Sequence, residues 1–277
     1  TSAFVLPSHS SPYSVYTGSW PGPNACGMAI STLPDGTLSN VSQSWKYGSK
    51  SAIHGMTFGR NLYSADLSGD VLWTHKVNSN GTVEAVASYP MPEAGMHPRH
   101  IAAHPNGNYV YVVMEAGNEV VAYSVNSTTG IIETDVGTYS LIPNRNALKD
   151  YWSAEVMISP STKLLWATAR AMQDSNNTGF ISCFNLDLGG NITDQIFRLP
   201  TTTTGGIANA VSPASWSDEF MALTDVPRGY VQIWQLVKGT DVAPGMVQGR
   251  DGWTSANMVA QVDIKDGGCC ANAIWYD

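Results

Sequence analysis

The chain repeats one pattern at a period of roughly 45 to 55 residues, and a fixed period of this length restricts the fold to repetitive architectures. Each repeat opens with a short apolar strand, turns through Gly, Asn or Ser, and continues into a second strand that ends in a charged residue. The paired segments are 53–58 with 63–66, 99–104 with 111–115, 154–158 with 166–170, and 208–211 with 220–225. An alternating strand follows each pair, at 71–75, 119–125, 179–185 and 230–236.

After each third strand a turn, for example 78–81 in one repeat, leads into a fourth strand with a weaker strand pattern. Four short strands per repeat are typical of a propeller blade, whereas a helical solenoid needs a 3.6-residue period that this sequence lacks. The opening segment fits the same template, with strands at 2–6, 13–16, 27–30 and 42–45. We therefore predict an all-β fold, a single β-propeller domain over 1–277, with five complete blades and one extra strand at 271–277.

Composition narrows the choice of partners. Charged residues make up 13% of the chain, the net charge is −8, and no run of Lys or Arg occurs. This argues against a nucleic acid or an anionic membrane as a partner. The apolar runs are also far shorter than the roughly 20 residues needed to cross a bilayer. An acidic protein must bind an anion through a local cluster of cations, so each of the few arginines matters.

Several features predict the compartment. Glycosylation sequons begin at five asparagines, which are Asn40, Asn80, Asn126, Asn176 and Asn191. With few lysines and a start at Thr1, they predict a mature secreted, extracellular glycoprotein. Four cysteines (Cys26, Cys183, Cys269 and Cys270) permit three disulfide pairings, among which the sequence does not choose. We expect structural disulfides or buried thiols there.

Polar residues fall at matching places in the repeats. In a propeller the innermost strand lines the channel, so its first residues and the last residues of the antiparallel second strand share one mouth. The strand starts carry His54, Arg99, Glu155 and Asn209, and the strand ends carry Asp66, Glu115, Arg170 and Asp225. This convergence suits a small polyanion. We expect Asp66, Glu155, Asn209 and Asp225 to be architectural, and we expect His75, His97 and His104, on outer strands or beside turns, to be structural.

Short phrases along the whole chain carry a family resemblance. They include Ile-His-Gly-Met at 53–56, Tyr-Ser-Ala-Asp-Leu at 63–67, His-Pro-Arg at 97–99, Met-Glu-Ala-Gly-Asn at 114–118, Ala-Arg-Ala at 169–171 and Asn-Ala-Ile-Trp-Tyr-Asp at 272–277. In this order they resemble the fungal 3-carboxy-cis,cis-muconate lactonizing enzymes, or carboxy-cis,cis-muconate cyclases. The resemblance implies a seven-bladed propeller and a cycloisomerase that needs no metal and no other cofactor.

The resemblance also implies which residues form the site. The family's proposed His and Glu fall on His54 and Glu115, as catalytic residues, and its two substrate-binding arginines fall on Arg99 and Arg170. We expect each arginine to grip one carboxylate through two hydrogen bonds. We expect His54 to act as the acid, and Glu115, kept ionised by an arginine, to orient or recharge it.

Two other functions stay open beside the cyclase. One is a secreted lactonase acting on a sugar lactone or lactonised acid, and the other is a non-catalytic propeller that binds a ligand or partner. The resemblance further implies that one and a half to two N-terminal blades are absent from this chain. The missing piece is expected to be a cleaved, associated fragment, or a part that was lost.

Overall fold

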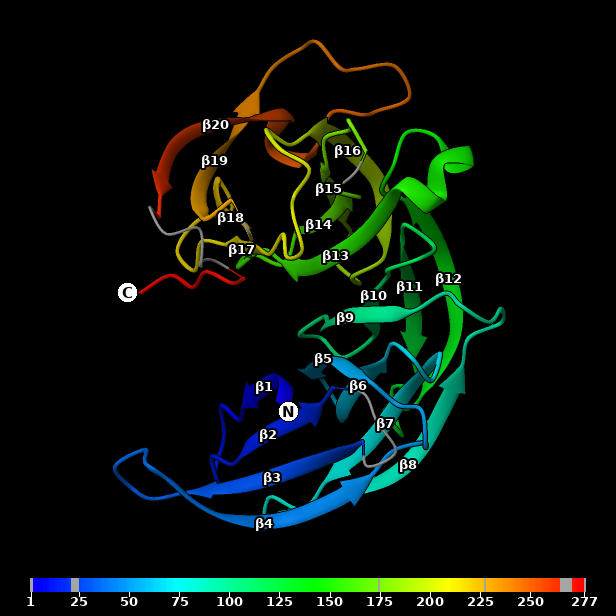
Figure 1. Cartoon of the computed structure of the whole chain (residues 1–277), viewed down its shortest axis with the longest axis vertical. Coiled ribbons are helices and arrows are strands. Elements are labelled where there is room, and N and C mark those ends of the chain that lie inside the picture. The colour runs from blue at the N-terminus through cyan, green and yellow to red at the C-terminus, as the bar shows by residue number, and fades with distance from the viewer. Residues whose placement is uncertain (1, 21–24, 174, 227, 265–270, 277) are drawn as a thin grey trace. The chain divides into compact units, whose positions relative to one another are not determined.

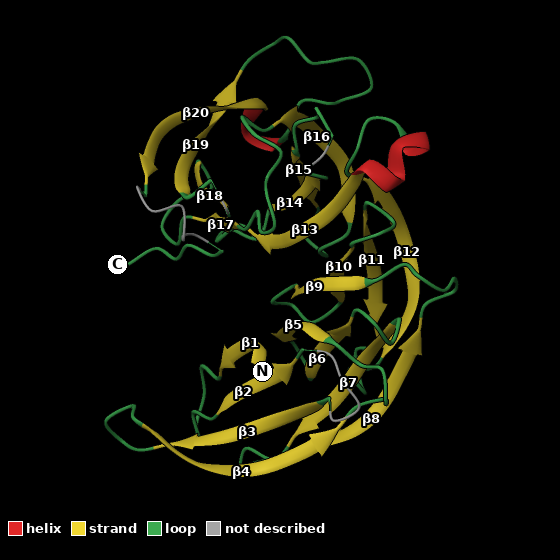
Figure 2. Ribbon diagram, in the orientation of Figure 1, coloured by secondary structure: helices red, strands yellow, loops and turns green. Residues whose placement is uncertain are grey.

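The computed structural model describes residues 2–20, 25–173, 175–226, 228–264 and 271–276. These residues form five four-stranded sheets, in each of which strands that follow one another in the sequence are neighbours (Figures 1 and 2). This order is that of a propeller blade, so the prediction of five four-stranded blades is confirmed.

The strands of the first three sheets match the predicted segments closely. The first sheet contains β1 (Ser2–Pro7), β2 (Val15–Ser19), β3 (Cys26–Thr32) and β4 (Leu38–Lys46). The second contains β5 (Ile53–Phe58), β6 (Leu62–Asp66), β7 (Val71–Val77) and β8 (Val83–Pro90). The third contains β9 (Pro98–Ala103), β10 (Tyr109–Met114), β11 (Glu119–Val125) and β12 (Ile132–Ser140).

The last two sheets follow a 3-10 helix, η1 (Arg145–Asp150). The fourth contains β13 (Tyr151–Ile158), β14 (Leu164–Ala171), β15 (Phe180–Leu186) and β16 (Ile192–Pro200). The fifth contains β17 (Val211–Pro213), β18 (Phe220–Asp225), β19 (Tyr230–Lys238) and β20 (Trp253–Asp263), with η2 (Arg250–Gly252) just before β20. Neither helix is long or apolar enough to cross a bilayer, and the described residues contain no other helix of that kind.

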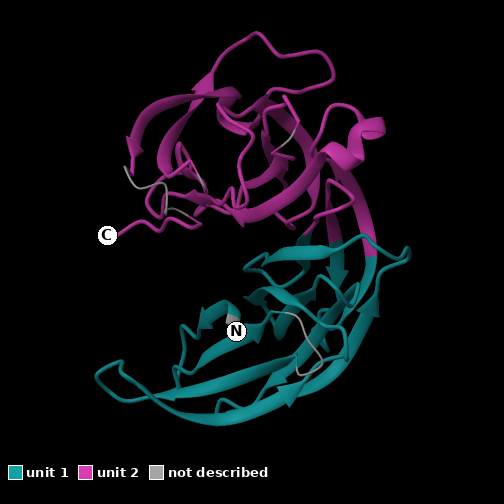
Figure 3. Cartoon of the chain, in the orientation of Figure 1, with its two compact units in different colours: residues 1–112, 123–134 teal, residues 113–122, 135–277 magenta. Residues whose placement is uncertain are grey.

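The chain divides into two compact units (Figure 3). Unit 1 contains residues 1–112 and 123–134, and unit 2 contains residues 113–122 and 135–277. Within unit 1 the innermost strands β1, β5 and β9 lie side by side, and within unit 2 β13 lies beside β17. That the two units form one propeller domain stays a prediction.

Burial follows the position of a strand in its sheet. The second strands β6 and β14 are buried along their whole length, while most residues of the fourth strand β4 are exposed. Apolar side chains between neighbouring sheets form a core in each unit. In unit 1 it includes Tyr16, Ile53, Met56 and Leu62, and in unit 2 it includes Trp166, Phe197, Met221 and Trp234. These packed cores hold the starts and ends of the strands in fixed positions within each unit.

Two predicted strands are wrong. The segment 208–211 was expected to be an innermost strand, but β17 is short and begins only at Val211, and Ala208 forms an isolated bridge. Gly205 and Gly206 both have positive φ, which turns the chain before a ladder can form. Residues 271–276 join no sheet. The Trp275 side chain holds them instead, because its indole N–H donates to the Ser212 carbonyl (2.9 Å).

Candidate functional site

In unit 1, His54 occupies a β-bulge of the innermost strand β5. Ile53 pairs with Asp66 and Gly55 pairs with Ala65, so His54 is the extra residue. A bulge re-aims a side chain and often occurs beside a functional site. Gly55 allows the neighbouring strand to come close, since a Cβ there would lie 2.5 Å from the Arg99 carbonyl oxygen and 2.8 Å from the His100 Cα. The sequence thus brings the bulge against β9.

The partner of His54 is His100, a residue that sequence reasoning did not select. The His100 Nε2 and His54 Nδ1 atoms are 3.1 Å apart, so one imidazole donates a hydrogen bond to the other. The Trp20 ring meets His54 edge-on at 5.1 Å, and Phe4 meets His100 at 5.7 Å. The only signal for His100 was its place beside Arg99 in a predicted innermost strand. Arg99 itself is buried in the same strand.

In unit 2, Arg170 is anchored by groups on three segments. Its Nη2 forms an ion pair with the Glu115 Oε2 (2.9 Å), and both side chains are largely buried. Its Nε donates to the Trp152 carbonyl (3.3 Å), and its Nη1 donates to the Ile207 carbonyl. The guanidinium carbon also lies 5.7 Å from the centre of the Trp152 ring. This ion pair is the arginine contact that was expected for Glu115.

A cavity of about 260 Å³ opens beside this ion pair in unit 2. Its lining consists of Trp152, Arg170, Ala171, Met172, Gln173, Gly206 and Ile207. The indole of Trp152 and the side chain of Ile207 are exposed to 44% and 62%, so the walls are open to a ligand. Of the four predicted site residues, Arg170 lines this cavity.

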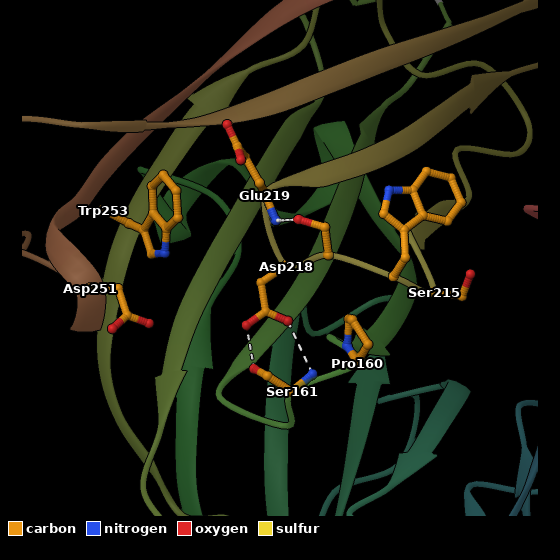
Figure 4. A pocket seen from close by; sticks show the side chains of 9 residues that line it. Pro160, Ser161, Ser215, Asp218, Glu219, Asp251 and Trp253 are labelled. Carbon is orange, nitrogen blue, oxygen red and sulfur yellow. Dashed lines mark hydrogen bonds between the residues drawn. The ribbon is translucent and has the colours of Figure 1, made fainter.

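A second cavity in unit 2, of about 320 Å³, contains none of the predicted residues (Figure 4). It lies at the β13–β14 and β17–β18 turns, and its carboxylates already have partners. Asp218 accepts hydrogen bonds from the backbone N–H (3.1 Å) and hydroxyl of Ser161, and Asp251 pairs with Lys163 Nζ (3.3 Å). Glu219 accepts from Gln235. Acidic walls make this hollow unsuited to a polyanion.

The four residues expected to be architectural are all buried. Asp66 accepts three N–H hydrogen bonds, from Ala52, Gly69 and Trp73. Glu155 occupies a bulge of β13 and accepts from the Val156 N–H (3.1 Å). Asn209 donates to the Thr224 carbonyl (3.4 Å). Asp225 accepts from the Thr203 hydroxyl, and burial raises its pKa.

The four predicted site residues therefore form two groups, His54 with Arg99 in unit 1 and Glu115 with Arg170 in unit 2. Their convergence on one mouth stays a prediction. His75 is a core residue of the third strand β7, where burial lowers its pKa to about 4. His97 is at a turn with positive φ, and the His104 ring accepts from the Asn106 N–H (3.3 Å) within another turn.

The cysteines and sequons have simple surroundings. Cys26 and Cys183 form no disulfide among the described residues, and Cys269 and Cys270 lie outside those residues. Asn40 is exposed on the outermost strand β4. The other four sequon asparagines lie in or beside turns or bends, and each is exposed or half-buried. No group of three His, Cys, Asp or Glu side chains that could hold a metal ion occurs in the described part of the chain.

Comparison with known proteins decides the family. The family model for the lactonases, described as a seven-bladed beta-propeller, matches residues 37–204. The chain belongs to this lactonase family. This lactonase-family protein is 36% identical to the carboxy-cis,cis-muconate cyclase of Neurospora crassa, over 99% of this chain and 73% of that protein. It is also 30% identical to muconate cycloisomerase 1 of Cutaneotrichosporon cutaneum, over 63% of this chain and 48% of that protein.

Solved structures of other proteins share the fold of this lactonase-family chain. A protein from Lactobacillus plantarum superposes with a TM-score of 0.70 at 18% identity, covering 94% of this chain and 74% of that chain. A putative 6-phosphogluconolactonase from Bacteroides uniformis gives 0.67 at 18% identity, covering 92% and 73%. The β-propeller class and the resemblance to the muconate cyclases are thus confirmed.

Proposed function

We propose that this protein is a cycloisomerase that closes a carboxylated cis,cis-muconate to its lactone. The observation that carries the proposal is the 36% identity to the Neurospora cyclase over 99% of this chain. The four residues assigned from the motifs are supported by their surroundings, because each is buried or half-buried, His54 pairs with His100, and Glu115 pairs with Arg170.

The reaction needs one new C–O bond and one new C–H bond. A substrate carboxylate oxygen adds to a carbon of the conjugated diene, and the displaced π electrons collect on the carbon beside another carboxylate. His54 delivers the proton to that carbon. His100, whose Nε2 is 3.1 Å from His54 Nδ1, then passes a proton to His54. Solvent reprotonates His100, so the proton added to the product comes from solvent in the net reaction.

The arginines hold the substrate and stabilise the charge that develops on it. We expect each arginine to bind a carboxylate, as the motifs predict. In unit 2, Glu115 fixes the guanidinium of Arg170 in one orientation through the 2.9 Å ion pair. Bringing the carboxylate to the diene in one geometry removes much of the entropic barrier. The enzyme therefore works through positioning, charge stabilisation and one proton transfer.

The test is incubation of the protein with 3-carboxy-cis,cis-muconate while the absorbance of the diene is followed. We expect loss of the diene signal with the wild type, and a rate lower by roughly 100- to 10,000-fold in His54→Gln. His9→Gln, which changes an exposed histidine in a turn, is the control and should keep full activity. Turnover of a panel of sugar lactones without turnover of the muconate would overturn the proposal in favour of a lactonase.

We also propose that the protein is a secreted glycoprotein. The support is the position of the five sequon asparagines, which lie in or beside turns or bends or on an outermost strand, and none of which is buried. The Asn80 side chain, for example, accepts hydrogen bonds from the N–H (3.0 Å) and hydroxyl (2.6 Å) of Thr82 within an exposed turn. Intact mass of the native protein before and after endoglycosidase treatment tests this, and an unchanged mass that matches the bare chain would contradict it.

A further inference from the structure

Trp152 lines the cavity beside Arg170, and the proposed reaction gives this tryptophan no role. Trp152 and Arg170 are directly opposite each other on the paired strands β13 and β14, so their side chains project from the same face. The Trp152 carbonyl accepts from Arg170 Nε, and the Trp152 ring lies 5.7 Å from the guanidinium carbon. The indole and the cation thus form one rigid element of the cavity wall.

The rest of the wall is mainly apolar. Ala171, Met172 and Ile207 line the cavity with Trp152, and Gln173 brings the one side-chain amide. A polyhydroxylated ligand would leave hydroxyl groups without partners against such walls, at a cost of about 1–3 kcal/mol each. A flat hydrocarbon chain would instead contact the indole face over its whole length.

The charge of the wall is balanced. Glu115 lies 2.9 Å from Arg170 Nη2, and the two side chains are exposed to only 14% and 5%. The pair carries no net charge, so it attracts a dianionic phosphate weakly. Three of the five guanidinium N–H groups donate to Glu115, Trp152 and Ile207, and a carboxylate is the ligand group whose geometry matches a guanidinium.

We infer that Trp152 is a specificity-determining residue, which selects a planar, unsaturated carboxylate by stacking on its conjugated chain while Arg170 binds the carboxylate. Glu115 strengthens the selection because it cancels the charge that a phosphate group would require. The inference rests on the proposed function for the identity of the site, and it adds which residue recognises the unsaturated part of the substrate.

Binding measured by calorimetry tests this with three probes: cis,cis-muconate, its saturated analogue adipate, and 6-phosphogluconate. We expect the wild type to bind cis,cis-muconate at least about 10-fold more tightly than adipate, which corresponds to 1.4 kcal/mol. Trp152→Leu should remove this preference, and Trp152→Phe, which keeps a flat ring, should restore most of it. Trp216→Leu alters another exposed indole of unit 2 that does not line this cavity, and it should leave the preference unchanged. Glu115→Gln should raise the affinity for 6-phosphogluconate relative to cis,cis-muconate.

The outcomes separate this inference from the proposed function. If the wild type fails to cyclise the muconate but keeps a Trp152-dependent preference for the unsaturated probe, the proposed function fails and the inference stands. If the wild type cyclises the muconate and Trp152→Leu keeps the full preference, the inference is overturned and the function stands. Absence of any preference in the wild type also overturns the inference.

Discussion

Two buried aspartates occupy the same repeat position in the two units. Asp66 ends β6 in unit 1 and Asp225 ends β18 in unit 2, and neither is exposed. Asp66 accepts three N–H hydrogen bonds, whereas Asp225 accepts one from the Thr203 hydroxyl. No donor among the described residues reaches Asp225 Oδ1 in hydrogen-bonding geometry, although the Arg228 and Gly205 amides lie near the carboxyl.

The sequence explains the difference. Trp73 donates to Asp66, and the residue at the same register in the fifth sheet is Gln232, whose amide donates to Thr202 and Gln261 instead. The Ala52 N–H donates to Asp66 from the residue just before β5, whereas the Gly205–Gly206 loop stands beside Asp225 in place of the start of an innermost strand. One repeat position therefore holds a fully bonded structural carboxylate in unit 1 and a partly bonded one in unit 2. The position predicts burial, and the neighbours decide the role.

The largest expected effect comes from Asp66→Ala. It leaves three buried N–H groups without an acceptor, and we expect the free energy of unfolding to fall by about 3–5 kcal/mol. Urea unfolding followed by far-UV circular dichroism measures this. Asp225→Ala, the matched variant, removes one hydrogen bond and should cost much less. Equal losses in the two variants would contradict the distinction between the two positions.

A second prediction concerns His75 of unit 1, whose titration should make the free energy of unfolding depend on pH. Burial among Trp45 and Tyr47 lowers the pKa of His75 in unit 1 to about 4, while an unfolded histidine titrates near 6.5. The unfolded state therefore binds the proton first, and stability that is complete above pH 6.5 falls by about 3 kcal/mol as the pH drops to 4.

His75→Phe keeps an aromatic ring in this cluster and removes the titration. We expect the variant to lose less stability than the wild type between pH 6.5 and 4, as measured by urea unfolding at several pH values. His9→Gln is the control and should follow the wild type. A His75→Phe profile parallel to that of the wild type would show that His75 does not carry this dependence.

Most of the strand positions, and part of the candidate site, could be predicted from the sequence. Apolar alternation and Gly-rich turns are local signals, so strands such as 53–58 and 63–66 were placed correctly. The His54–His100 pair was missed because it depends on how closely β5 approaches β9, which is a long-range property set at Gly55. The strand predicted at 208–211 failed because the positive φ of two glycines outweighed an apolar pattern.

A third prediction concerns that close approach. In Gly55→Ala the new Cβ would press on the Arg99 carbonyl and the His100 backbone, neither of which yields as a flexible side chain would. We expect a loss of stability of about 1–3 kcal/mol and, because His54 and His100 are pushed apart, a larger loss of cyclase activity. Gly48→Ala is the control, since a Cβ there meets only the Ser51 hydroxyl, at 3.2 Å. Full cyclase activity of Gly55→Ala would contradict the claim that the close approach at Gly55 positions the His54–His100 pair.

The smallest expected effect is that of Asp225→Asn, and it tests the comparison most directly. The amide keeps an oxygen that accepts from Thr203, and no charge has to be buried. Burial raises the pKa of Asp225, so the folded state binds the proton more tightly than the unfolded chain, and the wild type loses stability as the pH rises through that pKa. Asp225→Asn should escape this loss, and at pH 7 its free energy of unfolding should be equal to or slightly above that of the wild type.

Asp66→Asn is the matched variant, and its free energy of unfolding should fall below that of the wild type. Both carboxylate oxygens of Asp66 accept N–H hydrogen bonds, and the amide nitrogen that replaces one of them cannot accept. Urea unfolding of both variants at pH 4 and pH 7 measures the difference, and a destabilised Asp225→Asn protein at pH 7 would place Asp225 with Asp66 as a structural carboxylate.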